Sequence, residues 1–260
     1  MKGIKKRLEK GETLTGCWLN LGSSLTAEIV GLSGFDWVLI DLEHGAGEQK
    51  DLLHQLQALE HTQAGAVVRV ESYHKERIHR VLDLGAEGIM CPRVKSSLEA
   101  ETAIAGLHYP PRGIRGVAKM VRATGFGKNF DGYKNSTPEN ILGVIQIETA
   151  EALLELDQIA ALEGVDVLFI GPADLTVALG IDGDLDHPLF KEALEKITAS
   201  AKKANKATGI LIFDPADFIK YQDMGIQLIA CGSDATFVAN GAKNLANKLN
   251  NLKISSLRKV

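Results

Sequence analysis

The sequence has few cysteines, no long apolar run and no excess of positive charge. Its 260 residues include three cysteines, Cys17, Cys91 and Cys231, which lie far apart and form no CxxC motif. Such a sparse, odd number argues against a disulfide framework or a zinc site and suits a reducing compartment. No stretch approaches the ~20 apolar residues of a membrane span, and the basic N-terminus lacks the apolar region of a signal peptide. We therefore expect a cytoplasmic protein that does not enter a membrane.

The charge balance and the missing motifs exclude further classes of function. The formal net charge is −4 at pH 7, which argues against a surface for nucleic acid or anionic membranes. No GxGxxG motif opens a helix after the first predicted strand, so dinucleotide binding has no support. What remains is an ordinary globular composition, 45% hydrophobic and 24% charged, in which the order of apolar segments carries the information.

Short apolar strands alternate with amphipathic helices along the whole chain. The predicted strands are 15–20, 37–41, 66–70, 88–92, 143–147, 167–170, 209–213 and 228–231. The predicted helices are 25–32, 49–60, 75–84, 97–107, 150–159, 188–205, 215–224 and 235–249. Eight successive strand–helix units predict a parallel sheet with right-handed crossovers, closed as a (β/α)₈ TIM barrel. We expect residues 1–260 to form this single domain.

Two long segments interrupt the alternation. Residues 109–138 are long, glycine-rich and basic, and residues 181–188 follow the sixth strand. Long loops in compact domains usually carry function or contact a partner. The first segment returns from a helix to a strand, so it starts on the face opposite an active site, and its role stays open between folding over an edge and building an oligomer contact.

Acidic groups, an arginine and a histidine gather where the predicted strands end. The carboxyl ends of the strands of a TIM barrel form one mouth, which is where catalytic groups lie. A strand that runs into a core should stay apolar, so polar residues at these ends need an explanation. The strand ends supply Asp41, Glu43, His44, Arg69, Glu71, Gln146, Glu148, the segment 171–174 that ends in Asp174, and the segment 232–234.

These residue types suit metal-assisted chemistry on a carbonyl compound. Glu148 and Asp174 offer hard oxygen ligands without any thiolate or histidine pair, which favours Mg²⁺ or Mn²⁺ with retained waters. Arg69 supplies a rigid fork for a carboxylate or an oxyanion. His44 can titrate near neutral pH, with Asp41 to orient it. Together they could chelate a 2-oxo acid, stabilise its enolate and move a proton.

Each residue also has a structural interpretation. Asp174 could cap the helical segment 175–179, and Glu148 could stabilise the N-terminus of the next helix. Arg69 could simply pair with Asp41, and His44 could be an ordered loop residue. Glu43 is interpreted as pointing away from the mouth, and Asp234 is expected to cap the last helix. The concentration of all these groups at neighbouring strand ends makes function the better hypothesis.

Several longer stretches resemble one family. In chain order they are GCWLNLGSS, GFDWVLIDLEHG, VVRV, RVLDLGAEGIMCPRV, YPPRGIRGVA, VIQIETAEAL, GVDVLFIGPADLTVALG and GILI. They cover nearly the whole chain, and the combination of IQIET and FIGPADL with DLEHG upstream is specific. The chain resembles the class II pyruvate-dependent aldolases of the HpcH/HpaI type, such as 4-hydroxy-2-oxoheptanedioate aldolase and 2-dehydro-3-deoxyglucarate aldolase.

The resemblance implies a barrel of the phosphoenolpyruvate/pyruvate-domain type and an activity. The enzyme would cleave 4-hydroxy-2-oxo acids to pyruvate and an aldehyde through a metal-stabilised pyruvate enolate. It would form a hexamer, a trimer of dimers, with the last helix exchanged between partners. Glu148 and Asp174 would hold the metal, which would be Mg²⁺, Mn²⁺ or Co²⁺. The remaining implied roles are general acid/base catalysis by His44 with Asp41, and substrate binding by Arg69, Gln146, Asp174 and the backbone of Ala173.

The sequence departs from the family pattern around the aldehyde site. Met90-Cys91 precedes Pro92 in place of an apolar pair, and Arg93 follows, where it could enter the mouth or bind an acidic substrate tail. The segment Gly232-Ser233-Asp234 replaces the commoner Gly-Val-Asp, and residues 123–133 also differ. Asp83 matches a family position near a subunit boundary. These departures leave the identity of the aldehyde substrate open and do not affect the pyruvate half of the site.

Three alternatives remain to the aldolase hypothesis. A lyase for a citramalyl- or malyl-CoA thioester belongs to the same superfamily, but such chains are usually longer. A Schiff-base aldolase needs a lysine within a strand, and Lys95 lies past the end of the fourth one. A non-catalytic 2-oxo-acid-binding protein would not need the complete set of Glu148, Asp174, Arg69 and His44.

Overall fold

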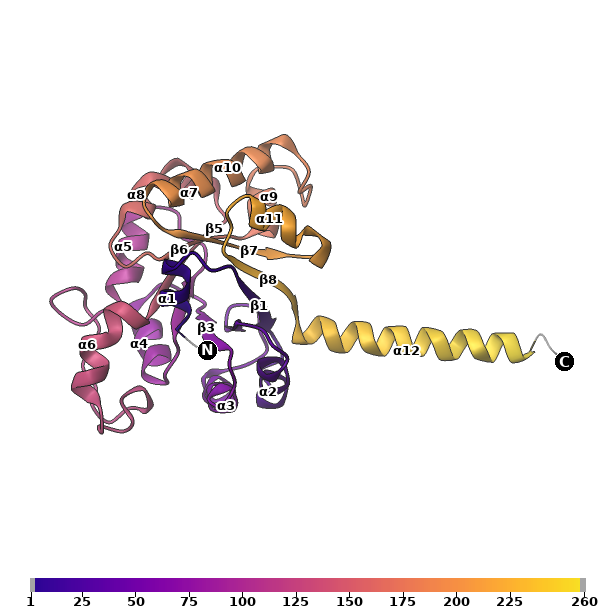
Figure 1. The fold of residues 1–260 in the computed structure, drawn as a ribbon, viewed down its shortest axis with the longest axis horizontal. Helices are drawn as coiled ribbons and strands as arrows, with labels where there is room; N and C mark the ends of the chain where they lie inside the picture. The colour runs from indigo at the N-terminus through magenta and orange to yellow at the C-terminus, as the bar shows by residue number, and fades with distance from the viewer. Residues whose placement is uncertain (1–2, 258–260) are drawn as a thin grey trace.

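Eight parallel strands form a closed barrel, as the sequence predicts. The computed structural model describes residues 3–257, and the strands follow one another around the barrel in chain order (Figure 1). Each strand is therefore hydrogen-bonded on both sides, with β1 also pairing β8. The strands are β1 Leu14–Leu19, β2 Trp37–Asp41, β3 Gly65–Arg69, β4 Gly88–Cys91, β5 Leu142–Ile147, β6 Val167–Ile170, β7 Ala207–Ile212 and β8 Leu228–Ser233.

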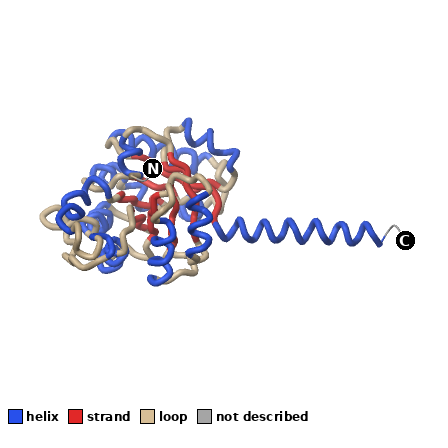
Figure 2. The backbone as a smooth tube through the Cα atoms, turned by 60° about the horizontal axis from the view of Figure 1, so that its bottom comes forward, coloured by secondary structure: helices blue, strands red, loops and turns tan. Residues whose placement is uncertain are grey.

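Helices surround the barrel and cover its strands (Figure 2). The first six are α1 Ile4–Glu9, α2 Ser24–Leu32, α3 Gln49–Leu59, α4 Lys75–Asp83, α5 Ser97–Ala105 and α6 Phe130–Asn140. The others are α7 Ala150–Leu154, α8 Leu156–Ala161, α9 Pro172–Ala178, α10 Pro188–Lys203, α11 Phe218–Asp223 and α12 Asp234–Leu257. Two 3₁₀ turns, η1 Arg122–Thr124 and η2 Pro215–Asp217, complete the list. No described helix is long and apolar enough to cross a membrane.

The structure corrects several predicted helix boundaries. The predicted helix 150–159 is divided into α7 and α8 at Glu155, whose backbone leaves the helical conformation. The predicted helix 215–224 begins as the turn η2. The last helix runs to Leu257, eight residues past its predicted end. The excursion 109–138 contains η1 and most of α6, and it is held by the fully buried Arg115, which pairs with Asp83 at 2.8 Å.

Apolar side chains fill the barrel on both sides of the strands. Inside, Trp18, Trp37 and Phe169 pack with ring centroids 5.6–6.4 Å apart. Glycines make room for them, because a Cβ on Gly16 would lie 2.2 Å from the Trp37 ring and one on Gly209 would lie 2.4 Å from Phe169. A second, larger cluster fills the space between strands and helices. This packing fills the inside of the barrel with apolar side chains, and the polar residues are left to the strand ends.

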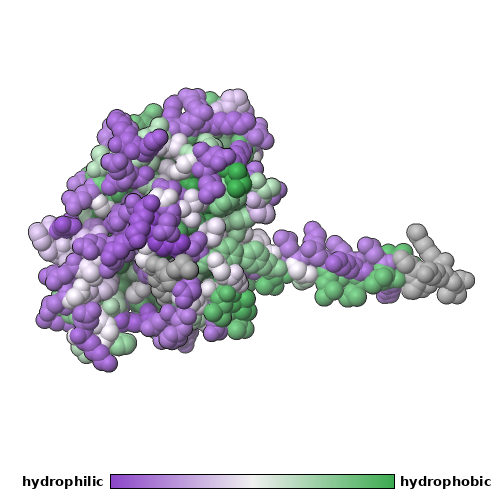
Figure 3. Space-filling view, viewed as in Figure 1, coloured by the Kyte–Doolittle hydropathy of each residue, from purple (hydrophilic) through white to green (hydrophobic). Residues whose placement is uncertain are grey.

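The helix α12 projects away from the barrel (Figure 1). Its apolar residues Val238, Leu245, Leu249 and Leu252 are 58–67% exposed and repeat at helical spacing. Figure 3 shows apolar surface along one side of the helix and a second apolar patch over α2. That patch consists of Leu25, Ile29 and Leu32, which are 58–69% exposed.

Candidate active site

Asp41 and Arg69 form a buried ion pair at the ends of β2 and β3. The parallel register places the two residues directly opposite each other. Arg69 donates from Nε to Asp41 Oδ1 at 2.9 Å and from Nη2 to Oδ2 at 2.8 Å. Burial alone would lower the pKa of Arg69, but the hydrogen bonds and charge of Asp41 and Glu43 outweigh it and raise the pKa. Arg69 therefore remains a fixed cation at the mouth.

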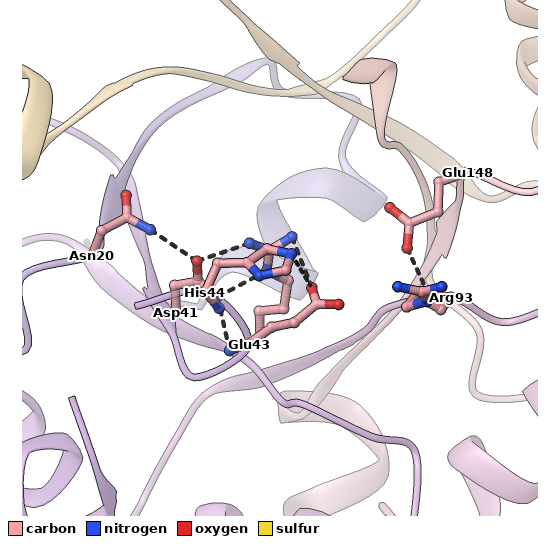
Figure 4. Close-up of polar contacts among 7 residues, drawn as sticks. Asn20, Asp41, Glu43, His44, Arg93 and Glu148 are labelled. Atoms are coloured by element: carbon pink, nitrogen blue, oxygen red, sulfur yellow. Dashed lines mark hydrogen bonds and ion pairs between the residues drawn. The ribbon is translucent and has the colours of Figure 1, made fainter. Parts of the chain in front are cut away.

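Asn20 completes the support of Asp41. It follows β1 and donates from Nδ2 to Asp41 Oδ2 at 2.8 Å, as Figure 4 shows. The backbone N–H of Asn20 in turn donates to Asp234 Oδ1 at 2.8 Å. Asp234 was expected to cap the last helix, but it is the first residue of α12, and Ser233 makes the capping bond by accepting from the backbone N–H of Thr236 at 3.1 Å. Asp234 instead joins the end of β8 to the end of β1. The sequence analysis did not identify Asn20, although a polar residue ending the first apolar strand was a signal of the same kind as Asp41.

Glu43 faces Arg69, so the interpretation that it points away from the mouth is wrong. Its Oε2 lies 3.0 Å from Arg69 Nη1, and its side chain is 10% exposed. The residue turns inward because the backbone N–H groups of Glu43 and His44 both bind Asp41 Oδ1, at 3.0 and 3.3 Å. Burial raises the pKa of the Glu43 carboxyl, while the charge of Arg69 lowers it in part.

His44 lies at the mouth, but Asp41 does not hold its imidazole. The Asp41 carboxylate is occupied by Arg69, Asn20 and two backbone N–H groups, one of which belongs to His44 itself. The imidazole is 65% exposed, and its Nε2 is 3.8 Å from Glu43 Oε2 (Figure 4). Asp41 therefore positions the backbone of His44, and Glu43 is the carboxylate that neighbours the ring.

Glu148 is a buried carboxylate with one oxygen unused. It follows β5, and its Oε1 accepts a hydrogen bond from the backbone N–H of Arg93 at 2.6 Å. Its Oε2 is buried and has no partner among the described residues, and the same is true of Gln146 Oε1. Burial raises the pKa of Glu148 to about 7; the Arg93 hydrogen bond opposes this, and the charge of Asp174 adds to it.

Gly171 makes the space in which the Glu148 carboxylate lies. A Cβ on Gly171 would be 2.5 Å from Glu148 Oε2 and 2.9 Å from Gln146 Nε2. The chain then enters α9 at Pro172, which brings Ala173 and Asp174 to the surface in the first turn. Gly171, and not Asp174, is the N-cap of α9, and Asp174 makes no capping hydrogen bond. The helix-cap interpretation of Asp174 is therefore wrong.

The residues present fit a hard divalent cation. The described residues contain no cluster of three or more histidine, cysteine or acidic side chains at metal-binding spacing. A magnesium-type site does not need one, because that ion keeps several waters and takes one or two carboxylates. The unpartnered Glu148 Oε2 is costly to bury unless a cation or a donor completes it. The charge of Asp174 acts on Glu148, so a second carboxylate lies within electrostatic reach of the first.

Comparison with known proteins identifies relatives of the whole barrel. The model of the HpcH/HpaI aldolase/citrate lyase family matches residues 14–241. A hydroxypyruvate/pyruvate aldolase from Agrobacterium fabrum is 39% identical over 244 residues, which are 94% of this chain and 91% of that protein. A 5-keto-4-deoxy-D-glucarate aldolase from Klebsiella pneumoniae is 38% identical over 94% of this chain and 95% of its own.

The solved structures give the same result. A family protein from Burkholderia cenocepacia superposes with a TM-score of 0.90 at 35% sequence identity. The superposition covers 96% of this chain and 100% of that one. The family match over residues 14–241 includes all the strand ends that build the mouth.

Proposed function

Because the chain belongs to the HpcH/HpaI aldolase/citrate lyase family, we propose that it is a divalent-metal-dependent aldolase. It cleaves 4-hydroxy-2-oxo acids to pyruvate and an aldehyde. Relatives named as pyruvate and ketodeoxyglucarate aldolases support this reaction type. The observation that carries the proposal is the buried Glu148 Oε2, which has no partner, at the mouth that also holds Arg69.

Glu148 and Asp174 are the proposed metal ligands, with Mg²⁺ or Mn²⁺ as the cation. Two carboxylates and retained waters suit either ion. When bound, the cation supplies Lewis acidity to the keto oxygen of the 2-oxo acid. Gln146 lies next to Glu148 and still has a free oxygen for a water or the substrate. The backbone N–H of the exposed Ala173 is the proposed contact for the pyruvate carboxylate.

Arg69 is the proposed binder of pyruvate and of its enolate. Its guanidinium has five N–H donors, of which Asp41 and Glu43 take three. The donors that remain can bind the oxygens on which negative charge develops. Because the guanidinium is already held by two carboxylates, it needs no reorganisation when that charge appears.

His44 is the proposed acid and base that exchanges a proton with the aldehyde-derived hydroxyl. Its exposed imidazole can meet a substrate at the mouth. A histidine titrates within the physiological pH range, so it can both accept and donate the proton. Glu43 is the carboxylate next to the ring, and Asp41 fixes the backbone from which the ring projects.

Exchange of the pyruvate methyl protons tests the proposal without knowledge of the aldehyde. Pyruvate in D₂O is followed by NMR in the presence of the protein with Mg²⁺, with Mn²⁺ or with a chelator. We expect exchange that depends on the metal. A protein that binds Mn²⁺ but exchanges no methyl proton would refute the aldolase half-reaction and would favour a CoA-thioester lyase or a binding protein.

We also propose that copies of the chain assemble through α12 into a hexamer of three dimers. The apolar stripe of α12 and the patch on α2 offer two surfaces that an exchanged helix would cover. Light scattering during size-exclusion chromatography measures the assembly. Leu249→Asp, on the stripe, should dissociate it, while Asn247→Asp, on the other side of α12, should not. Equal masses for the two variants would contradict this interface.

A further inference from the structure

Arg93 lies at the mouth, one hydrogen bond away from Glu148. It follows Pro92 at the end of β4, and its backbone N–H donates to Glu148 Oε1 at 2.6 Å. Figure 4 shows Arg93 and Glu148 together, across the mouth from Asp41 and His44. The backbone of Arg93 has a φ of 56°, in the left-handed region that few residues other than glycine occupy. The hydrogen bond thus fixes a residue whose conformation is costly, and it fixes it beside the proposed metal.

The guanidinium of Arg93 is a free cation. Its side chain is exposed and makes no hydrogen bond or ion pair with any residue in the described range 3–257. The other basic side chains nearby are occupied. Arg69 is bound by Asp41 and Glu43, and Lys95 lies 3.9 Å from Glu151.

Apart from Arg93, the groups at the mouth carry more negative than positive charge even when the proposed cation is counted. Asp41, Glu43, Glu148 and Asp174 bring four negative charges, against one positive charge on Arg69 and two on the proposed cation. The pyruvate half of the substrate adds its own carboxylate. A second carboxylate on the aldehyde half would be repelled by this excess of negative charge, and Arg93 is the group that can offset the repulsion. An arginine fork binds a carboxylate through two parallel hydrogen bonds.

We infer that Arg93 binds a second carboxylate at the far end of the substrate. The protein would then prefer 4-hydroxy-2-oxo acids with two carboxylates, which yield an aldehyde that carries an acid group. The inference rests on the proposed aldolase function and names the substrate class for the same site. Arg93 acts in it as a specificity residue that contacts the part of the substrate away from the bond that breaks.

Paired analogues that cannot be cleaved test the inference by binding alone. The pairs are 2-oxoglutarate with 2-oxopentanoate and 2-oxoadipate with 2-oxohexanoate, which differ in the far carboxylate. Calorimetric titration with Mn²⁺ gives their dissociation constants. A charged hydrogen bond should favour the dicarboxylate of at least one pair by ~10–100-fold. Arg93→Met should abolish most of this ratio, and Arg93→Lys should retain part of it because the charge remains.

Lys95→Met is the matched control, because it removes a neighbouring positive charge that already has a partner. It should keep the wild-type ratio. No preference for dicarboxylates in the wild type, or an unchanged ratio in Arg93→Met, would overturn the inference. If the wild type shows metal-dependent pyruvate exchange but Arg93→Met leaves the ratio unchanged, only the role of Arg93 is refuted. If exchange is absent, the proposed function fails and this inference fails with it.

Discussion

Replacing Gly171 by alanine should weaken metal binding without unfolding the barrel. The new Cβ would lie 2.5 Å from Glu148 Oε2, and ordinary contact begins at 3.4 Å, so the carboxylate must move by about 0.9 Å. The backbone tolerates alanine, since φ is −94°. Displacement of groups that orient metal ligands typically lowers affinity ~10–100-fold. We expect a loss of that size for Mn²⁺, smaller than the loss in Glu148→Gln.

Titration calorimetry with Mn²⁺ measures the loss, and circular dichroism without metal checks the fold. Gly241→Ala is the matched control, because it lies in α12 and its Cβ would meet nothing within 4 Å. The control should bind Mn²⁺ like the wild type and keep its helical circular dichroism, since alanine is the better helix residue. A folded Gly171→Ala protein with unchanged Mn²⁺ affinity would refute the assignment of Glu148 as a ligand.

Two further predictions concern buried charges. Arg69→Met should abolish pyruvate exchange and lower the free energy of unfolding by about 3–5 kcal/mol, because it leaves Asp41 buried and unpaired. Adding Asp41→Asn should restore the stability measured in urea titrations but should not restore exchange. An Arg69→Met protein as stable as the wild type would contradict the buried pair. Burial lowers the pKa of His108 to about 4 from 6.5, so the unfolded chain is protonated first as pH falls. Stability should therefore be full above about pH 6.5 and decline by up to about 3 kcal/mol toward pH 4. Urea titrations at several pH values measure this decline, which His108→Asn should flatten. The control His54→Asn, at an exposed position on α3, should leave the decline unchanged. The same decline in both variants would refute the role of His108.

The barrel could be predicted from sequence because each strand is a compact apolar run followed by an amphipathic helix. The spacing of apolar residues changes between that of a strand and that of a helix, in the order in which the strands and helices occur. The structure of the excursion 109–138 was not predicted, because this segment lacks such a pattern. Its helix α6 has little buried surface and contains Pro138, and the anchor of the region is Arg115, whose ion pair with Asp83 spans 32 residues. No local sequence pattern predicts an ion pair between residues so far apart in the chain.

The site was predictable as a set of strand ends but not as a set of contacts. Parallel strands of known order bring Asp41, Arg69 and Glu148 to one mouth, whatever their side chains do. Which carboxylate faces which cation depends on neighbouring strands. Glu43 turns inward because Asp41 binds its backbone and Arg69 attracts its side chain, and this information lies in a strand that follows later in the chain.

The projecting α12 has a consequence for how the protein should be handled. A helix gains most of its stability from packing one apolar side, and the 24 residues of α12 pack little against their own barrel. If a second copy covers the stripe, the stability of α12 depends on association of the two copies, and both then follow mass action. The melting temperature then rises with protein concentration. Stabilities of variants can be compared only at equal concentration, and dilution for an assay is itself a perturbation of the fold.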